Sequence, residues 1–200
     1  FIFKENFYEL QNKNIHNFDF LNFSNKLGGG IGINLSKKSI FGWFKKNKYK
    51  LNFPWSDDLT SKRFINILYN YEYINSSSKK ADKKKIDNIV YFHMERILLD
   101  FKIKKIGEFT SFDLVGFLLS SLIINKMSSR KIEYMRFIIE QQIDRLGMHK
   151  SYNLLEHSKF INNLNEIKNI LRFFNLKEST FFEELILKMT SILNQYFHND

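Results

Sequence analysis

The sequence contains no cysteine and only one proline, Pro54, among its 200 residues. The absence of cysteine excludes disulfides, thiolate metal sites and cysteine nucleophiles, and it leaves the cellular compartment open. The longest apolar runs, such as residues 114–125, contain glycine or serine and stop short of the roughly 20 residues that a membrane-spanning helix needs. The sequence therefore predicts a soluble protein, or a subunit of a soluble complex, with no membrane span.

Acidic side chains are missing from residues 20–56, although this segment carries seven lysines. Aromatic residues alternate with these lysines, namely Phe41, Trp43, Phe44, Tyr49, Phe53 and Trp55. Ammonium groups neutralise phosphates, while aromatic rings stack on bases or pack into a neighbouring protein. The segment therefore predicts contact with a polyanion.

The whole chain is basic, with 31 Lys and Arg against 21 Asp and Glu, a formal net charge of +10. Nucleic acid, an anionic membrane surface or an acidic protein would complement this charge, and nucleic acid is favoured. The abundance of Asn, Lys, Ile and Phe is typical of coding in an AT-rich genome, which raises the lysine count. That bias does not explain the missing carboxylates.

Residues 1–58 lack sustained helical periodicity, and the glycines at 28–30 and 32 interrupt any regular element. Short apolar pieces at 31–35 and 39–44 are compatible with strands or extended chain. We therefore predict an extended basic and aromatic arm over residues 1–58, with room for one hairpin. Its phenylalanines at 18, 20 and 23 are expected to anchor in another surface.

Residues 59–200 predict a helical domain, because apolar residues recur there at steps of three and four. The expected helices cover approximately residues 60–73, 83–102, 111–126, 129–146, 162–174 and 180–196. Thr110 with Asp113, and Thr180 with Glu183, have the spacing of capping boxes. The fold class is thus mostly α, as about three helix hairpins. A recurrence of about 50 residues favours an α-solenoid-like repeat, and an irregular helical bundle is the alternative.

Two stretches of this domain resemble a known family. Residues 109–122 (FTSFDLVGFLLSSL), and residues 165–174 (NEIKNILRFF) followed by 181–185 (FFEEL), resemble heptatricopeptide-type repeats. Such repeats occur in FAST-kinase-like and RAP-domain organellar RNA-binding proteins. The resemblance covers about residues 109–195, with a spacing longer than the family's usual period and no RAP domain before Asp200. It implies a role in organellar RNA metabolism, and some lineages use such proteins as mitochondrial ribosome subunits.

Catalytic motifs are not evident. The glycines at 28–32 are followed by Ser36 and Lys37 without the Gly-Lys-Ser/Thr order of a phosphate-binding loop, and a dinucleotide fingerprint also fails at Leu35. No two of the five histidines lie one helical turn apart with a carboxylate, as a zinc site requires. We therefore expect no enzyme activity, no metal and no cofactor.

Two lysine runs are the predicted RNA-binding residues. The first lies in the acid-free segment and comprises Lys37, Lys38, Lys45, Lys46, Lys48 and Lys50, together with Trp43 and Tyr49. The second precedes a predicted helix and comprises Lys79, Lys80, Lys83, Lys84 and Lys85. For the second run, a solvated surface without a partner is the alternative.

These observations predict a non-catalytic, RNA-associated structural subunit of a large ribonucleoprotein, such as a mitochondrial or other organellar ribosome. The arm would contact rRNA phosphates, and the helices would contact other subunits. One alternative is an accessory subunit of an organellar respiratory or membrane complex without RNA. A second alternative is a free-standing organellar RNA-processing factor.

Overall fold

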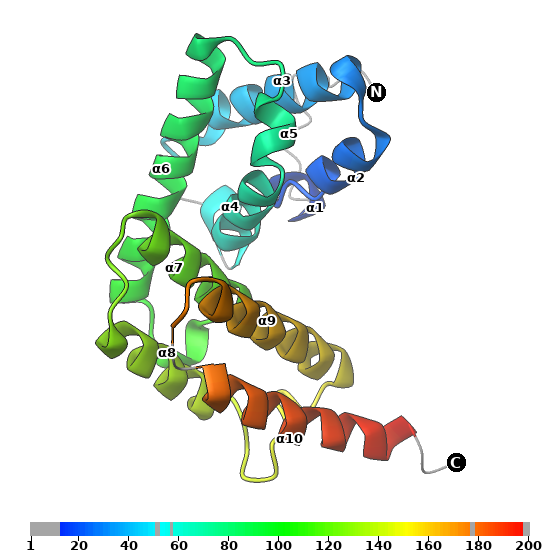
Figure 1. Ribbon diagram of the computed structural model, residues 1–200, viewed down its shortest axis with the longest axis vertical. Helices are drawn as coiled ribbons and strands as arrows, with labels where there is room; N and C mark the ends of the chain where they lie inside the picture. The colour runs from blue at the N-terminus through cyan, green and yellow to red at the C-terminus, as the bar shows by residue number, and fades with distance from the viewer. Residues whose placement is uncertain (1–12, 51–52, 57, 177–178, 198–200) are drawn as a thin grey trace. The chain divides into compact units, whose positions relative to one another are not determined.

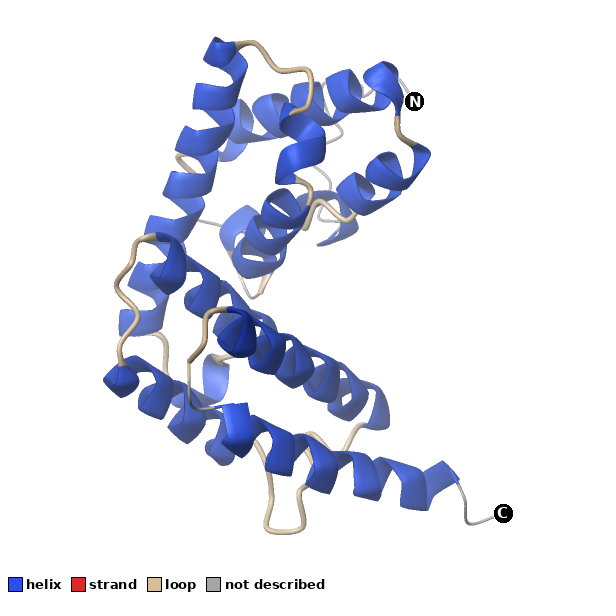
Figure 2. Ribbon diagram, in the orientation of Figure 1, coloured by secondary structure: helices blue, strands red, loops and turns tan. Residues whose placement is uncertain are grey.

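The computed structural model describes residues 13–50, 53–56, 58–176 and 179–197 (Figure 1). These residues are mostly helical, as predicted, and none of them forms a strand (Figure 2). The chain divides into two compact units, residues 1–100 and 101–200. The predicted boundary after residue 58 is therefore wrong, because the residues before it belong to the same unit as those up to 100.

Unit 1 contains α1 (Lys13–His16), α2 (Phe20–Leu27), α3 (Gly29–Asn47), a 3-10 helix (Phe53–Trp55), α4 (Leu59–Tyr69), α5 (Tyr71–Asn75) and most of α6 (Lys80–Ile103). The prediction of an extended arm is therefore wrong for residues 13–50, which are largely helical. Residues 1–12, the start of that predicted arm, lie outside the described residues. The predicted helix at 60–73 exists but is divided at Asn70 into α4 and α5.

The glycines between residues 28 and 32 serve a turn and a close contact. Gly28 and Gly29 have φ angles of +67° and +81°, which favour glycine, and they connect α2 to α3. A Cβ on Gly32 would lie 2.6 Å from the Tyr73 hydroxyl oxygen, so a larger residue there would force the Tyr73 side chain of α5 to shift. Glycine costs a helix about 1 kcal/mol relative to alanine, and tertiary packing here outweighs that preference.

Arg63 lies at the centre of the unit 1 core and is fully buried. Its Nη1 donates to the His16 carbonyl oxygen at 2.6 Å, and its Nε donates to Nε2 of His93 at 2.8 Å. The guanidinium carbon is 3.9 Å from the ring centroid of Trp43 and 4.7 Å from that of Trp55. One arginine of α4 thus connects α1, α3, the 3-10 helix and α6.

His93 is held in one neutral tautomer by this cluster. Its Nε2 accepts from Arg63, so its Nδ1 carries the proton and donates to the Ile89 carbonyl oxygen at 2.7 Å. Burial, and then the Arg63 charge, hold the pKa of His93 well below its ordinary value. Protonation of His93 at Nε2 would place a second N–H donor and a second positive charge against the Arg63 guanidinium.

Unit 1 is therefore expected to lose stability as the pH falls below about 6.5, the ordinary histidine pKa. The folded pKa lies lower, so the unfolded chain binds the proton first. Urea unfolding at about pH 7.5 and about pH 5 measures the loss. In the His93→Gln variant an amide is able to accept from Arg63 and donate to Ile89 without titrating. An equal loss of stability in wild type and variant would refute the role of His93.

Asparagine side chains join α2 to α4 across a polar interface. Asn22 Nδ2 donates to Asn66 Oδ1 at 2.9 Å, and Asn25 Nδ2 donates to Asn70 Oδ1 at 2.9 Å. Asn70 Nδ2 in turn donates to Asn22 Oδ1 at 2.8 Å. Because amides both donate and accept, each bond fixes the relative position of the two helices. This ladder is the second set of contacts that holds the N-terminal helices in place.

Unit 2 contains the end of α6, a 3-10 helix (Ile106–Glu108), α7 (Ser111–Ile123), α8 (Ser129–Gln141), α9 (Leu154–Phe173) and α10 (Ser179–Phe197). The predicted helices of this region are confirmed, although α8 ends earlier and α9 begins earlier than expected. The predicted capping box of Thr180 and Glu183 is wrong, because α10 already begins at Ser179.

The capping box of Thr110 and Asp113 is confirmed. The Thr110 Oγ1 accepts from the Asp113 amide at 3.3 Å, while the Asp113 Oδ2 accepts from the Thr110 amide at 3.0 Å. Lys104 adds a salt bridge to the same carboxylate at 2.9 Å. These bonds satisfy the free amides at the start of α7 and fix where the helix begins.

The first helices of the two hairpins in unit 2, α7 and α9, pack on each other, and α9 packs on α10 (Figure 1). The Asn163 Nδ2 donates to the Ser111 Oγ at 2.7 Å between α7 and α9. The first residues of α7 and α9 (111 and 154) are 43 apart, and those of α8 and α10 (129 and 179) are 50 apart. Within unit 2 the predicted recurrence of about 50 therefore holds for the second helices but not for the first.

Candidate nucleic-acid interface

The solvent-facing side of α3 becomes basic toward its C-terminal end. Asn34, Lys38, Phe41 and Lys45 follow one another at steps of four, three and four, so they share one side of the helix. Lys38 and Lys45 are exposed, while Ile40 and Trp43 face the core. The helical period thus places Lys38 and Lys45 on the exposed side of α3, although in the sequence they belong to one continuous run of lysines and aromatic residues.

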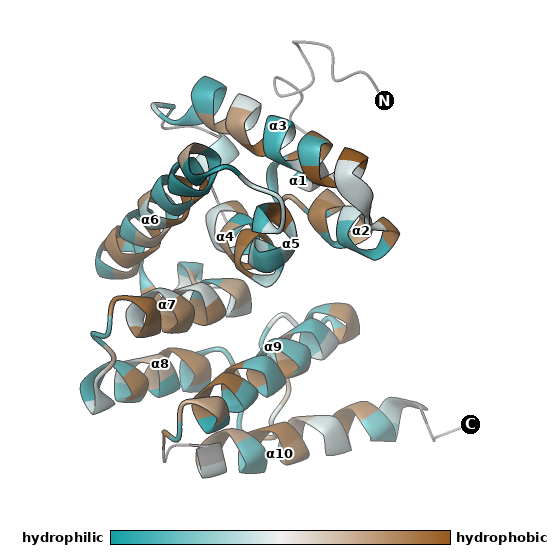
Figure 3. Cartoon of the chain, turned by 45° about the horizontal axis from the view of Figure 1, so that its top comes forward, coloured by the Kyte–Doolittle hydropathy of each residue, from teal (hydrophilic) through white to brown (hydrophobic). Residues whose placement is uncertain are grey.

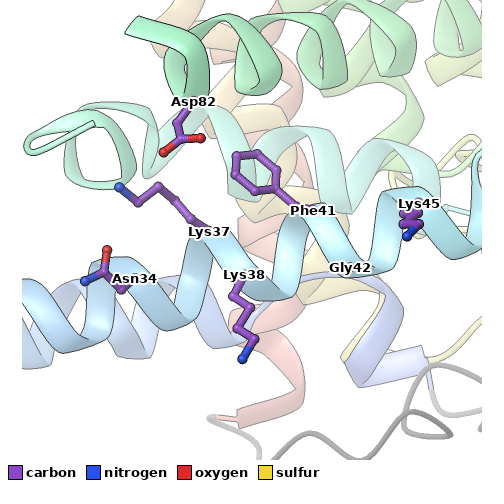
Figure 4. Close-up of a pocket in the computed structure, with 7 residues that line it drawn as sticks. All are labelled: Asn34, Lys37, Lys38, Phe41, Gly42, Lys45 and Asp82. Carbon is purple, nitrogen blue, oxygen red and sulfur yellow. The ribbon is translucent and has the colours of Figure 1, made fainter. Parts of the chain in front are cut away.

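The first turns of α6 meet this side of α3. The Lys85 Nζ lies 5.4 Å from the ring centroid of Phe41, and the Lys37 Nζ donates to the Ser78 Oγ at 3.2 Å. A shallow depression of about 480 Å³, open to solvent, lies here and is lined by Asn34, Lys37, Lys38, Phe41, Gly42, Lys45 and Asp82 (Figure 4). The two predicted lysine runs, about 40 residues apart in sequence, therefore form one surface.

Most of the predicted lysines are accessible, but not all border the depression. Lys38, Lys45, Lys79, Lys80, Lys83, Lys84 and Lys85 are exposed, as is Tyr49, whereas Lys46, Lys48 and Lys50 are half-buried. At 3.6 residues per turn, Lys80 and Lys84 lie about half a turn from Asp82 around α6, so they lie outside the depression. We call Lys38, Lys45 and Lys85 the lysine rim.

The prediction of RNA contact is wrong for two residues, Trp43 and Lys37, because both are buried. Trp43 is 0% exposed, and its Nε1 donates to Nδ1 of His16 at 2.9 Å, so no base is able to stack on it. Lys37 is 7% exposed, and its ammonium group is bound to Ser78. It therefore ties α3 to the loop before α6, because a lysine buries its methylenes and places only its charged end at a polar partner.

Lys48 and Tyr49 lie just beyond the end of α3. The Lys48 Nζ is 5.0 Å from the ring centroid of Tyr49 and 5.6 Å from that of Phe44, within the range of a cation–π contact. The Tyr49 side chain is 85% exposed. This predicted residue is therefore available to an external partner, although it does not line the depression.

One carboxylate enters this basic surface. Asp82 lies in the depression and forms a 3.6 Å salt bridge with Lys85. Since residues 20–56 carry no acid, α3 itself supplies only positive charge. Nowhere in the described ranges do three or more His, Cys, Asp or Glu side chains gather as metal ligands would. The arrangement suits neutralisation of phosphates along a chain.

Sequence reasoning missed Asn34, Phe41 and Asp82 as members of this surface. A helical period over residues 34–45 would have placed Phe41 beside Lys38 and Lys45. The preceding glycines instead indicate irregular chain. Nothing in the sequence indicates that Asp82 comes close to α3.

Four large apolar side chains lie exposed where α2 turns into α3. Phe23, Leu27, Ile31 and Leu35 are 66%, 71%, 80% and 47% exposed. Figure 3 shows the hydrophobic colouring at these adjoining ends of α2 and α3. We call these four residues the apolar ridge. The predicted anchoring phenylalanines divide accordingly, since Phe18 is buried in the unit 1 core and Phe23 belongs to the ridge.

Comparison with protein-family models, with curated proteins and with solved structures finds no match to this chain. No helix within the described residues is both long enough and apolar enough to cross a membrane. A proposal for the function therefore rests on the chemistry of the chain's own residues.

Proposed function

We propose that the protein is a non-catalytic, RNA-associated structural subunit of a large ribonucleoprotein. The RNA lies along the surface formed by α3 and the first turns of α6. Its phosphates contact the lysine rim, together with the neighbouring ammonium groups of Lys79 and Lys83. Neither a metal nor a cofactor takes part.

The observation that supports this proposal best is the convergence of two lysine runs on one surface. Lys38 and Lys45 come from α3, and Lys85 from α6, yet all three border the same depression or its aromatic wall. Each ammonium group that meets a phosphate releases a condensed counterion, and the free energy adds along the chain. A polymer of phosphates is therefore the partner that uses all of these charges together.

The apolar ridge supports membership of an assembly rather than a protein that works alone. Four large apolar side chains around the connection from α2 to α3 rarely remain in water, and such patches mark interaction sites. RNA presents a polar and anionic backbone, which does not complement Leu27 and Ile31. A neighbouring protein subunit of the same particle is the partner proposed for the ridge.

The particle proposed is a mitochondrial or other organellar ribosome. This part of the proposal rests on the resemblance of residues 109–195 to organellar RNA-binding helical repeats. The helix hairpins α7–α8 and α9–α10 cover that region, and α7 packs on α9 as consecutive repeats would. Such repeats serve as subunits in some lineages, and the exposed ridge favours a subunit over a free-standing factor.

Sedimentation of the tagged native protein, with and without ribonuclease, tests the proposal. We expect the protein to migrate with a large particle and to leave it after digestion. Migration in a particle that ribonuclease leaves unchanged would contradict the proposal and favour a subunit of a complex without RNA. Migration as a small species that binds transcripts by itself would favour a free-standing processing factor.

A further inference from the structure

We infer that the depression between α3 and α6 receives one unpaired base of single-stranded RNA. In this arrangement the ring of Phe41 stacks on the base, and the carboxylate of Asp82 accepts from its exocyclic amino group. The inference rests on the proposed function and adds the class of RNA, single-stranded rather than duplex.

Phe41 provides the stacking surface. Its side chain is partly exposed and lines the depression, and in Figure 4 it extends from α3 toward the side where Asp82 lies. The Lys85 ammonium group lies over this ring, 5.4 Å from its centroid, so a positive charge stands at the stacking surface. Aromatic rings among lysines are the combination that binds single strands, because every base has a flat face.

Asp82 decides that a base, and not a phosphate, enters the depression. A carboxylate repels a phosphate placed beside it, whereas it accepts a hydrogen bond from an amino group of a base. Asn34 lines the same depression and offers both a donor and an acceptor. The interior of the depression therefore suits the polar edge of a base, while the phosphates remain outside.

The phosphates have their own contacts at the border. Lys38 and Lys45 lie on the same side of α3 as Phe41, and in Figure 4 the Lys38 side chain extends away from Asp82. Both lysines are exposed. The base thus binds in the depression and the phosphates bind at its border. A duplex is unable to bind in this way, because its bases are paired and stacked inside.

The preference among bases follows from Asp82. Cytosine, adenine and guanine carry an exocyclic amino group that donates to a carboxylate, and uracil carries none. The rejection of uracil is expected to be about tenfold, the lower part of the range for one good base contact. Oligocytidine is therefore expected to bind more tightly than oligouridine of the same length.

Fluorescence anisotropy of the full chain with labelled oligocytidine, oligouridine and an RNA duplex tests the inference. Phe41→Leu keeps an apolar side chain but removes the ring, and it is expected to weaken single-strand binding about tenfold or more while duplex binding stays unchanged. Phe44→Leu is the matched control, because Phe44 lies on the same helix and packs on Phe92 instead. Asp82→Asn should reduce the preference for cytidine over uridine.

Three results would overturn the inference. The first is an equal loss of single-strand and duplex binding in Phe41→Leu. The second is an equal loss in Phe44→Leu. Either would leave the proposed function standing, because RNA would still bind the lysines. The third is a wild-type protein that binds neither RNA, which would remove the proposed function as well. Thermal melting of each variant shows that the fold is retained.

Discussion

Replacing Lys38, Lys45 and Lys85 with glutamine is expected to weaken RNA binding about 100-fold in about 0.1 M salt. Each contact with a phosphate of a single strand changes log affinity by about −0.7 per decade of salt, which corresponds to roughly fivefold per contact at that concentration. Three lost contacts multiply to about 100-fold. Glutamine keeps a flexible polar side chain, only one atom shorter than that of lysine, so the change mainly removes charge.

The matched control replaces Lys102, Lys126 and Lys150, which are exposed lysines of unit 2, with glutamine. This variant has the same net charge as the first and should bind RNA nearly as well as wild type. If both triple variants lose the same affinity, the net charge of the chain and not the lysine rim determines binding. Filter binding or anisotropy at constant salt gives the comparison.

Arg63→Ala is expected to destabilise unit 1 by about 3 to 5 kcal/mol. The change leaves Nε2 of His93 and the His16 carbonyl without their donor, and each buried unsatisfied group costs about 1 to 3 kcal/mol. It also opens a cavity between Trp43 and Trp55. Burial lowers the pKa of Arg63, so the folded core opposes its charge. The lost bonds and the cavity outweigh the relief of that burial.

The two tryptophans of the chain report directly on this cluster. The sequence has only Trp43 and Trp55, and both lie against Arg63, so urea unfolding followed by tryptophan fluorescence measures unit 1. Arg63→Met fills the space without the bonds and should cost less than Arg63→Ala. An Arg63→Ala variant as stable as wild type would show that the guanidinium does not hold the N-terminal helices.

Helices after residue 59 were predictable because their apolar stripes and caps are local signals. Thr110 and Asp113 mark the start of α7 by their own side chains. The helices before residue 50 were not predictable in the same way. Their glycines and lysines are typical of a loop. The α3 helix is instead stabilised by contacts with residues distant in sequence, such as that of Trp43 with Arg63.

The asparagines show how composition misleads. An AT-rich genome accounts for their number, yet it does not account for the hydrogen bonds that join Asn22 and Asn25 to Asn66 and Asn70. These pairs are separated by 44 and 45 residues in the chain. A polar interface of this kind has no apolar periodicity, so only the folded structure shows it.

The candidate surface was predictable in part. Lysine density alone indicates both runs, and in the structure Lys38, Lys45 and Lys85 are exposed. The burial of Trp43 was not evident, because an aromatic residue among lysines is equally suited to a core and to a base. The meeting of the two runs depends on the packing of α3 and α6, which no local pattern encodes.

The salt dependence of RNA binding tests the central claim most directly. For the wild-type chain and the rim variant, log affinity is plotted against log salt concentration with single-stranded RNA. The wild-type line should be steep, and loss of three phosphate contacts should make its slope shallower by about 2. Equal slopes for the two proteins, or no measurable binding by wild type at low salt, would contradict contact between these lysines and RNA.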